Sequence, residues 1–166
     1  LVVLIIFAVI MIFALLFGIL ISNPIEVGGR KAYINASVDP EKNVEIGLIG
    51  FAFKNSYGNI VKTMFLKNLY IFFWSLLLVI PGIIKSYSYK MVPYILAENP
   101  GMDSNEAIQQ SMDMTQGHKW NMFVLDLSFL GWWLLGMLAL FIGTLFVYPY
   151  VDATYAQLYL SLKEEA

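Results

Sequence analysis

Asp126 is the residue whose type and position most strongly suggest chemistry, because it is the only charged residue within three long apolar runs. A carboxylate inside a bilayer costs about 2.5–3.5 kcal/mol on insertion scales, so it marks a candidate functional site. Two roles stay open. Asp126 is a proton or substrate site, or it pairs helices near the membrane interface, close to Trp120, and we favour the second role. Lys85 and Lys90 are its expected partners.

Pro81 and Gly82 form the second candidate site, inside the apolar run at residues 68–84. Proline removes a backbone hydrogen bond and glycine loosens the helical turn, so we expect the helix to kink or break there. A broken helix in a membrane exposes helix ends and free carbonyls that can bind an ion or a polar substrate. The alternative, which we favour, is a plain kink or the turn of a re-entrant hairpin.

Enzymatic chemistry finds little support in the remaining residues. The chain has no cysteine and a single histidine, His118, beside a lysine and a tryptophan that are typical of a membrane boundary. Asp126 and Asp152 are far apart in sequence, and neither is preceded by a Gly-x-Gly motif, so an aspartyl pair is not indicated. Without a phosphate-binding glycine loop or a metal-ligand cluster, we expect no catalytic residue, metal or cofactor.

The composition excludes a soluble globular or disordered protein. Of 166 residues, 59% are hydrophobic and 13% are charged, against about 45–50% and 25% in ordinary soluble domains. A net charge of −2 gives no electrostatic footprint for nucleic acid. The expected partner is therefore the lipid bilayer, and another membrane protein or a second copy of the chain remains open.

These features predict an all-α, polytopic transmembrane helical bundle formed as one domain over residues 1–166. Residues 1–21 carry no charge and, at about 1.5 Å per residue, match the bilayer's hydrocarbon thickness of about 30 Å. Further passes are expected at residues 68–84 and 122–148, the second of them tilted or ending before Pro149. Because the chain opens inside an apolar run, we expect that it lacks an N-terminal portion.

Shorter elements are expected between these passes. Asn23 and Pro24 predict the start of a new helix, and residues 86–97 predict a re-entrant or interfacial half-helix. Residues 103–116 predict an acidic amphipathic helix that Gly117 ends, docked on the protein's own helices or on a partner. Small residues that recur every fourth position suggest close helix packing. They are Gly28, Ala32, Ala36, Ala139 and Gly143.

The basic residues leave two topologies open. Residues 22–67 carry six lysines and arginines and residues 85–121 carry three. With three crossings the two connections lie on opposite sides, and the first is cytoplasmic by the positive-inside rule. If residues 68–97 dip into the bilayer and return, all nine basic residues share one side, so the charge bias favours this second topology.

Several segments together resemble a known family. They are residues 76–89 (LLLVIPGIIKSYSY), residues 94–100 (YILAENP), Glu106-Ala107-Ile108 followed by Ser111, Met114, Gly117, Lys119 and Trp120, and residues 127–132 (LSFLGW), continuing to Tyr155 and Tyr159. Their order and spacing resemble the uncharacterised bacterial membrane family catalogued as domain of unknown function 975, over residues 23–162. The middle of the chain is also similar to membrane domains of some glycerophosphodiester phosphodiesterases.

The resemblance implies a multi-pass helical protein of the bacterial cytoplasmic membrane and implies no established activity. Our first functional hypothesis is a non-enzymatic module that binds or helps assemble another membrane component, through its small-residue stripes and its acidic amphipathic helix. The alternative is a transport or lipid-handling subunit that uses the Pro81-Gly82 break and Asp126.

Overall fold

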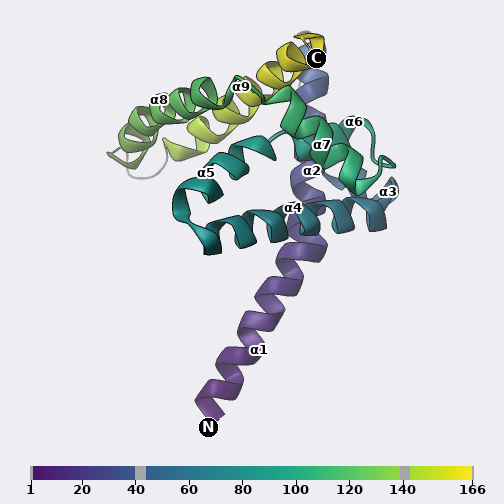
Figure 1. Ribbon diagram of the computed structural model, residues 1–166, viewed down its shortest axis with the longest axis vertical. Helices are drawn as coiled ribbons and strands as arrows, with labels where there is room; N and C mark the ends of the chain where they lie inside the picture. Colours follow the sequence, from purple (N-terminus) through teal and green to yellow (C-terminus); the bar gives the residue numbers. More distant parts are fainter. Residues whose placement is uncertain (1, 40–43, 139–142, 166) are drawn as a thin grey trace.

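The computed structural model describes residues 2–39, 44–138 and 143–165, and every regular element within them is a helix (Figure 1). This confirms the all-α prediction. In chain order the elements are α1 (Val2–Phe17), the π-helical turn η1 (Gly18–Ser22), α2 (Asn23–Val38), the 3-10 turn η2 (Ile46–Gly50), α3 (Phe51–Lys54), α4 (Tyr57–Leu77), α5 (Val79–Ser88), α6 (Val92–Glu98), α7 (Ser104–Met114), α8 (Lys119–Leu138) and α9 (Thr144–Glu165).

The first helix passes through Pro24 without ending, so the prediction of a new helix at Asn23 is wrong. Helices α1, η1 and α2 form one continuous helix, Val2–Val38. Proline cannot donate to the carbonyl one turn earlier, that of Leu20. The π-helical turn widens the backbone here, with the Asn23 N–H donating to Gly18, and the hydroxyl of Tyr57 donates to the Leu20 carbonyl at 2.8 Å.

Two of the described helices, Val2–Val38 and Tyr57–Leu77, are long and apolar enough to cross a membrane. None of the side chains of α1 is buried, and Figure 1 shows α1 projecting away from the rest of the chain. Soluble monomers rarely expose an apolar surface as long as these sixteen residues. The length and composition of these two helices indicate association with a membrane.

Residues 68–84 do not form a single helix, because α5 folds back along α4 as a helical hairpin (Figure 1). The chain turns at Leu78, whose backbone is extended (φ −159°, ψ 142°), and not at Pro81 and Gly82 as predicted. Pro81 lies in the first turn of α5, where its missing N–H costs no helical hydrogen bond. Gly82 permits the close approach, since a Cβ there would lie 2.7 Å from the Cα of Ser75.

The described part of residues 122–148 likewise belongs to two helices. Helix α8 ends at Leu138, and α9 begins at Thr144, packs against α8 and continues through Pro149. The rings of Trp133 and Tyr148 meet edge to face at 4.5 Å between centroids. Figure 1 shows this second hairpin extending to the same side of the molecule as the turn of α4 and α5.

The hydrophobic core lies where the bases of these hairpins meet α2 and α6. Helix α6 supplies its centre, with all residues from Val92 to Ala97 buried, and contacts α2, α4 and α7. The segment 86–97, predicted as one half-helix, is therefore the end of α5, a turn and the buried helix α6. Pro93 lies in the first turn of α6, where no N–H is needed for the helix.

The amphipathic helix α7 docks on the protein's own helices α4, α6 and α9, one of the two docking modes predicted. The Asp103 side chain caps it by accepting from the Asn105 N–H at 2.9 Å. Its inner face is Ser104, Ala107, Ile108, Ser111 and Met114, and Gly117 follows its end in the left-handed conformation (φ +84°).

The small-residue stripe on α2 faces another segment of the same chain. A Cβ on Gly28 would lie 2.2 Å from the carbonyl oxygen of Ile49, so only glycine lets η2 approach α2 this closely. Ala32 is buried along the same stripe and Ala36 is partly buried. Gly143 directly precedes α9, whereas Ala139 lies outside the described residues.

Candidate functional site

A charged cavity of about 340 Å³ lies between the bases of the two hairpins and α2. Six charged residues from different parts of the chain line it, three acidic and three basic. They are Glu26 and Arg30 of α2, Lys67 of α4, Lys90 of the turn after α5, Asp126 of α8 and Asp152 of α9. Charged groups gathered in a concave site next to apolar surface are typical of ligand-binding positions.

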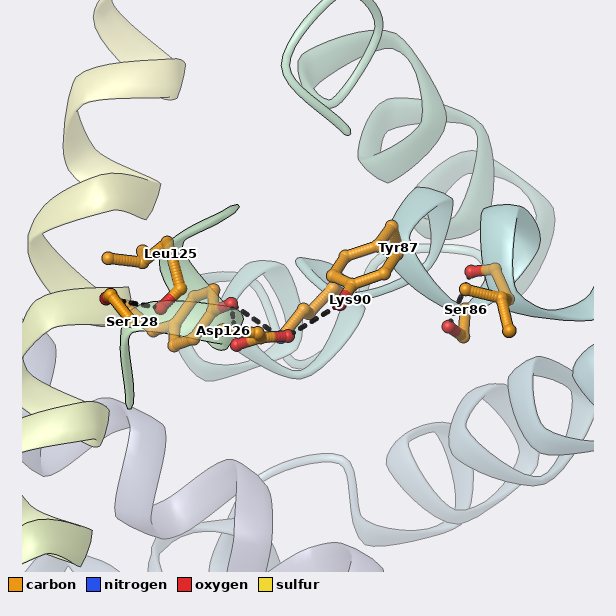
Figure 2. Close-up of polar contacts among 8 residues, drawn as sticks. Ser86, Tyr87, Lys90, Leu125, Asp126 and Ser128 are labelled. Atoms are coloured by element: carbon orange, nitrogen blue, oxygen red, sulfur yellow. Dashed lines mark hydrogen bonds and ion pairs between the residues drawn. The ribbon is translucent and has the colours of Figure 1, made fainter. Parts of the chain in front are cut away.

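Asp126 is the centre of a complete hydrogen-bond network on one side of this cavity. Its carboxylate accepts from Lys90 Nζ at 2.7 Å, from the Tyr87 hydroxyl at 2.9 Å and from the Tyr155 hydroxyl. Lys90 also donates to the Tyr155 hydroxyl at 2.6 Å. Figure 2 shows Tyr87 and Lys90 reaching Asp126 from the same side. The network therefore ties α8 to α5, to the turn after α5 and to α9.

Of the two lysines predicted as partners of Asp126, the structure places Lys90 against it. Lys90 makes the ion pair, and its ammonium also lies 4.0 Å from the centroid of the Tyr155 ring. Burial lowers the pKa of Lys90, while the hydrogen bond to Asp126 opposes that shift. Lys85 points elsewhere, toward the ring of Trp74 (5.1 Å) and the sulfur of Met112.

Arg30 dominates the opposite side of the cavity. It forms an ion pair with Asp152 across the fold and a second one with Glu26 at 3.6 Å within α2. Its guanidinium also lies 5.1 Å from the centroid of the Tyr94 ring. The Arg30 Nε is buried and has no hydrogen-bond partner among the described residues. This side is therefore held by ion pairs that leave one donor unused.

Lys67 is the sixth charged residue, and it differs from the other five. Its side chain lines the cavity from α4 and only 9% of the residue is exposed. The described residues give it neither a hydrogen bond nor an ion pair, whereas Arg30 and Lys90 each have carboxylate partners. An ammonium that lines a cavity without a protein partner is available to a bound ligand or to water.

Sequence reasoning did not find Lys67, Arg30 or Asp152 as site residues. Lys67 stands at the edge of an apolar run and is indistinguishable from a boundary lysine until α4 is packed against α2. Pro81 and Gly82, by contrast, lie toward the hairpin turn and do not line the charged cavity. For Lys67, the sequence signal that could have pointed to the site was a single charge beside a long apolar run.

A larger groove of about 430 Å³ lies farther along the second hairpin, between α8 and α9. Its lining includes Trp132, Leu135, Phe146 and Tyr150 and carries no charged residue. Tyr150 of this groove is followed directly in α9 by Val151, which lines the charged cavity. An apolar groove and a charged cavity thus occupy successive turns of the same helix.

A further polar cluster stands outside the cavity, where α6 meets the end of α9. Glu98 accepts from Lys163 Nζ at 2.7 Å and from the Tyr159 hydroxyl at 2.5 Å. Burial alone would raise the pKa of Glu98, but the hydrogen bonds from Lys163 and Tyr159 hold it below its ordinary value of 4.5. These contacts fix α9 on α6, and the described residues contain no cluster fit to hold a metal ion.

Fold and cavity together define an all-helical protein with two helices long and apolar enough to span a membrane, built around a charged cavity. The whole chain, residues 1–166, matches the family described as Protein of unknown function (DUF975). The chain belongs to this family, as its sequence motifs predicted. No curated protein and no solved structure matches it.

Proposed function

We propose that this chain is a non-enzymatic, multi-pass module of the bacterial cytoplasmic membrane that handles lipids or transports a polar solute. In this proposal the two helical hairpins insert into the bilayer and the charged cavity at their base holds the ligand. The observation that carries it is the cavity itself, lined by six charged residues from both hairpins and α2.

The exposed surfaces of the hairpins support their insertion into lipid. Large apolar side chains near both hairpin ends are mostly exposed, for example Leu76 (72%), Ile80 (71%) and Phe146 (76%). Patches of this kind on a monomer mark contact with a membrane or a partner. A hairpin that enters and leaves on one face also places residues 22–67 and 85–121 on the same side, as the positive-inside rule favours.

The competing hypothesis is a module that assembles another membrane component. Two of the surfaces that it could use for a partner are covered by the chain itself. The stripe at Gly28 and Ala32 is covered by η2, and the inner face of α7 is covered by α4, α6 and α9. Helix α1 remains available to a partner because none of its side chains is buried. Ligand handling at the cavity is therefore the better supported function.

The first experiment tests the hairpin topology with single cysteines, since the chain has none of its own. Glu45→Cys and Asn105→Cys stand at exposed positions in the two connections, and Leu78→Cys stands at the hairpin turn. With an impermeant maleimide we expect Glu45→Cys and Asn105→Cys to react only after cells are permeabilised, and Leu78→Cys to stay protected in both conditions. Labelling of the two connections from opposite sides would establish three crossings and overturn the hairpin topology.

The second experiment tests whether the cavity holds a ligand. Native mass spectrometry of the chain released from mild detergent should show a non-covalent adduct on the wild type. Val151→Trp places a large ring at the cavity wall and should remove the adduct, whereas Gln157→Trp, exposed on the same helix, should keep it. A wild type without any adduct, or equal adducts on both variants, would refute ligand handling at this site.

A further inference from the structure

We propose that Lys67, beside Arg30, binds the phosphate group of the ligand held in the charged cavity. This inference rests on the proposed function and names the chemistry of its ligand. Lys67 is 9% exposed and lines the cavity without a hydrogen bond or an ion pair among the described residues, and Arg30 lines the same cavity.

The pairing of the other charges singles out Lys67. Asp152 and Glu26 both pair with Arg30, and Asp126 pairs with Lys90. The three carboxylates are thus engaged, and one ammonium with three N–H donors is left facing the cavity. An ammonium that lines a cavity without a protein partner is available to a bound anion, which supplies the acceptors that the protein does not. A phosphate suits Lys67 because its several oxygens can accept from the N–H donors of the ammonium.

The position of Lys67 along α4 fits a lipid phosphate. Lys67 stands ten residues before Leu77, the last residue of α4. At about 1.5 Å per residue this places it about 15 Å from the hairpin turn, which is half of the bilayer's hydrocarbon thickness of about 30 Å. If the turn reaches the bilayer midplane, Lys67 lies at the depth where hydrocarbon gives way to phosphate headgroups.

The groove between α8 and α9 offers room for the apolar part of such a ligand. It has a volume of about 430 Å³ and an uncharged lining, and its Tyr150 directly precedes Val151 of the charged cavity. In this proposal a phospholipid with its phosphate on Lys67 places an acyl chain in this groove. The same phosphate chemistry is also available from free inorganic phosphate, so the experiment separates the two sources.

The test measures binding of phosphatidylglycerol to the delipidated full chain in dodecyl maltoside micelles. Diacylglycerol with the same acyl chains serves as the probe without phosphate. Lys67→Met should weaken phosphatidylglycerol binding by about tenfold or more and leave diacylglycerol unchanged. Lys67→Arg should retain most of the affinity. Lys62→Met, which removes the same charge at an exposed position of α4, should bind like the wild type.

The outcomes separate this inference from the proposed function. If Val151→Trp removes the native adduct but Lys67→Met and Lys62→Met bind phosphatidylglycerol equally well, the ligand site stands and its phosphate chemistry is refuted. Diacylglycerol that binds the wild type as tightly as phosphatidylglycerol refutes it too. Circular dichroism shows whether Lys67→Met folds. If it does not fold, Lys67→Arg is titrated with phosphatidylglycerol instead, and a folded Lys67→Arg that has lost binding counts against the site.

Inorganic phosphate as a competitor identifies the source of the ligand. Binding of phosphatidylglycerol that depends on Lys67 and that millimolar phosphate does not displace supports a lipid headgroup. Binding of inorganic phosphate that depends on Lys67, with none of the lipid, supports a free phosphate site. Both results confirm the role of Lys67, and insensitivity of both ligands to Lys67→Met refutes it.

Discussion

The two sides of the charged cavity hold their charged groups in different ways. On the α8 side, Asp126 accepts three hydrogen bonds, and Lys90 is paired both with it and with the Tyr155 hydroxyl. On the α2 and α4 side, Arg30 shares two carboxylates but keeps an unused Nε, and Lys67 has no partner among the described residues. One side is saturated, and the other keeps unused donors.

This difference separates a structural role from a binding role. A saturated network in a low-dielectric site fixes the helices that contribute to it. Unpaired donors in the same cavity do not stabilise the fold. The helices that carry them, α2 and α4, are therefore held in place by packing. We therefore expect Asp126 to act as a helix-pairing residue and Lys67 to act as a ligand-binding residue. The predictions that follow test this division.

We expect the largest loss of stability from a substitution at Gly28, where α2 packs directly against η2. A Cβ at this position would lie 2.2 Å from the Ile49 carbonyl oxygen, so Gly28→Ala forces η2 away from α2. We expect a loss of about 3 kcal/mol in the free energy of unfolding, measured by chemical denaturation in detergent. Gly29→Ala is the matched control: nothing lies within 4 Å of its Cβ, and better helix propensity should stabilise the fold by about 0.5–1 kcal/mol. Equal effects of the two substitutions would show that η2 does not depend on this contact.

The second effect tests the saturated side. Asp126→Ala leaves Lys90 and the hydroxyls of Tyr87 and Tyr155 without their acceptor. We expect a loss of about 2 kcal/mol, less than for a fully buried pair because the Asp126 side chain is 34% exposed. Thermal unfolding followed by tryptophan fluorescence measures it. Unchanged stability, combined with loss of the native adduct, would instead make Asp126 a ligand contact.

The sequence predicts the helices well but not where the chain turns. Pro81 and Gly82 signal an interruption, and its position three residues earlier at Leu78 follows from where α4 and α5 pack on each other. Pro24 has the pattern of a helix start, yet a π-helical turn and a hydroxyl of distant Tyr57 let the helix continue. Such compensation comes from tertiary contacts, which local propensity does not contain.

The candidate site follows the same rule. Asp126 stands out in sequence because a single carboxylate interrupts an apolar run, and Lys90 follows from the need to pair it. Lys67 does not stand out, since a lysine at the end of an apolar run is ordinary at a membrane boundary. Its meaning depends on burial by α2 and on the absence of a partner among the described residues, both of which require the fold.

A third, smaller effect concerns a saturated carboxylate outside the cavity, Glu98. Hydrogen bonds from Lys163 and Tyr159 hold its pKa below 4.5 although burial opposes this. A carboxylate with a lowered pKa in the folded state stabilises the fold above its unfolded pKa, and that contribution is lost as the pH falls through the folded value. We therefore expect Glu98→Gln to cost about 1 kcal/mol at pH 7 and to reduce the loss of stability on acidification below about pH 4.5. Unfolding midpoints of both proteins between pH 7 and pH 3 check this, and parallel profiles would contradict it.

The smallest effect has the opposite sign and concerns Lys67. An unpaired buried charge that serves only a ligand is a cost in the empty protein, so Lys67→Met should leave the delipidated chain equally stable or stabilise it by up to about 1 kcal/mol. Lys62→Met, at an exposed position on the same helix, should stay within about 0.5 kcal/mol of the wild type. Chemical denaturation of the three delipidated proteins measures these values. A marked destabilisation by Lys67→Met alone would place Lys67 with Asp126 among the residues that hold the helices together. Equal or greater stability, with weaker phosphatidylglycerol binding, would separate the two sides of the cavity into one that maintains the fold and one that binds the ligand.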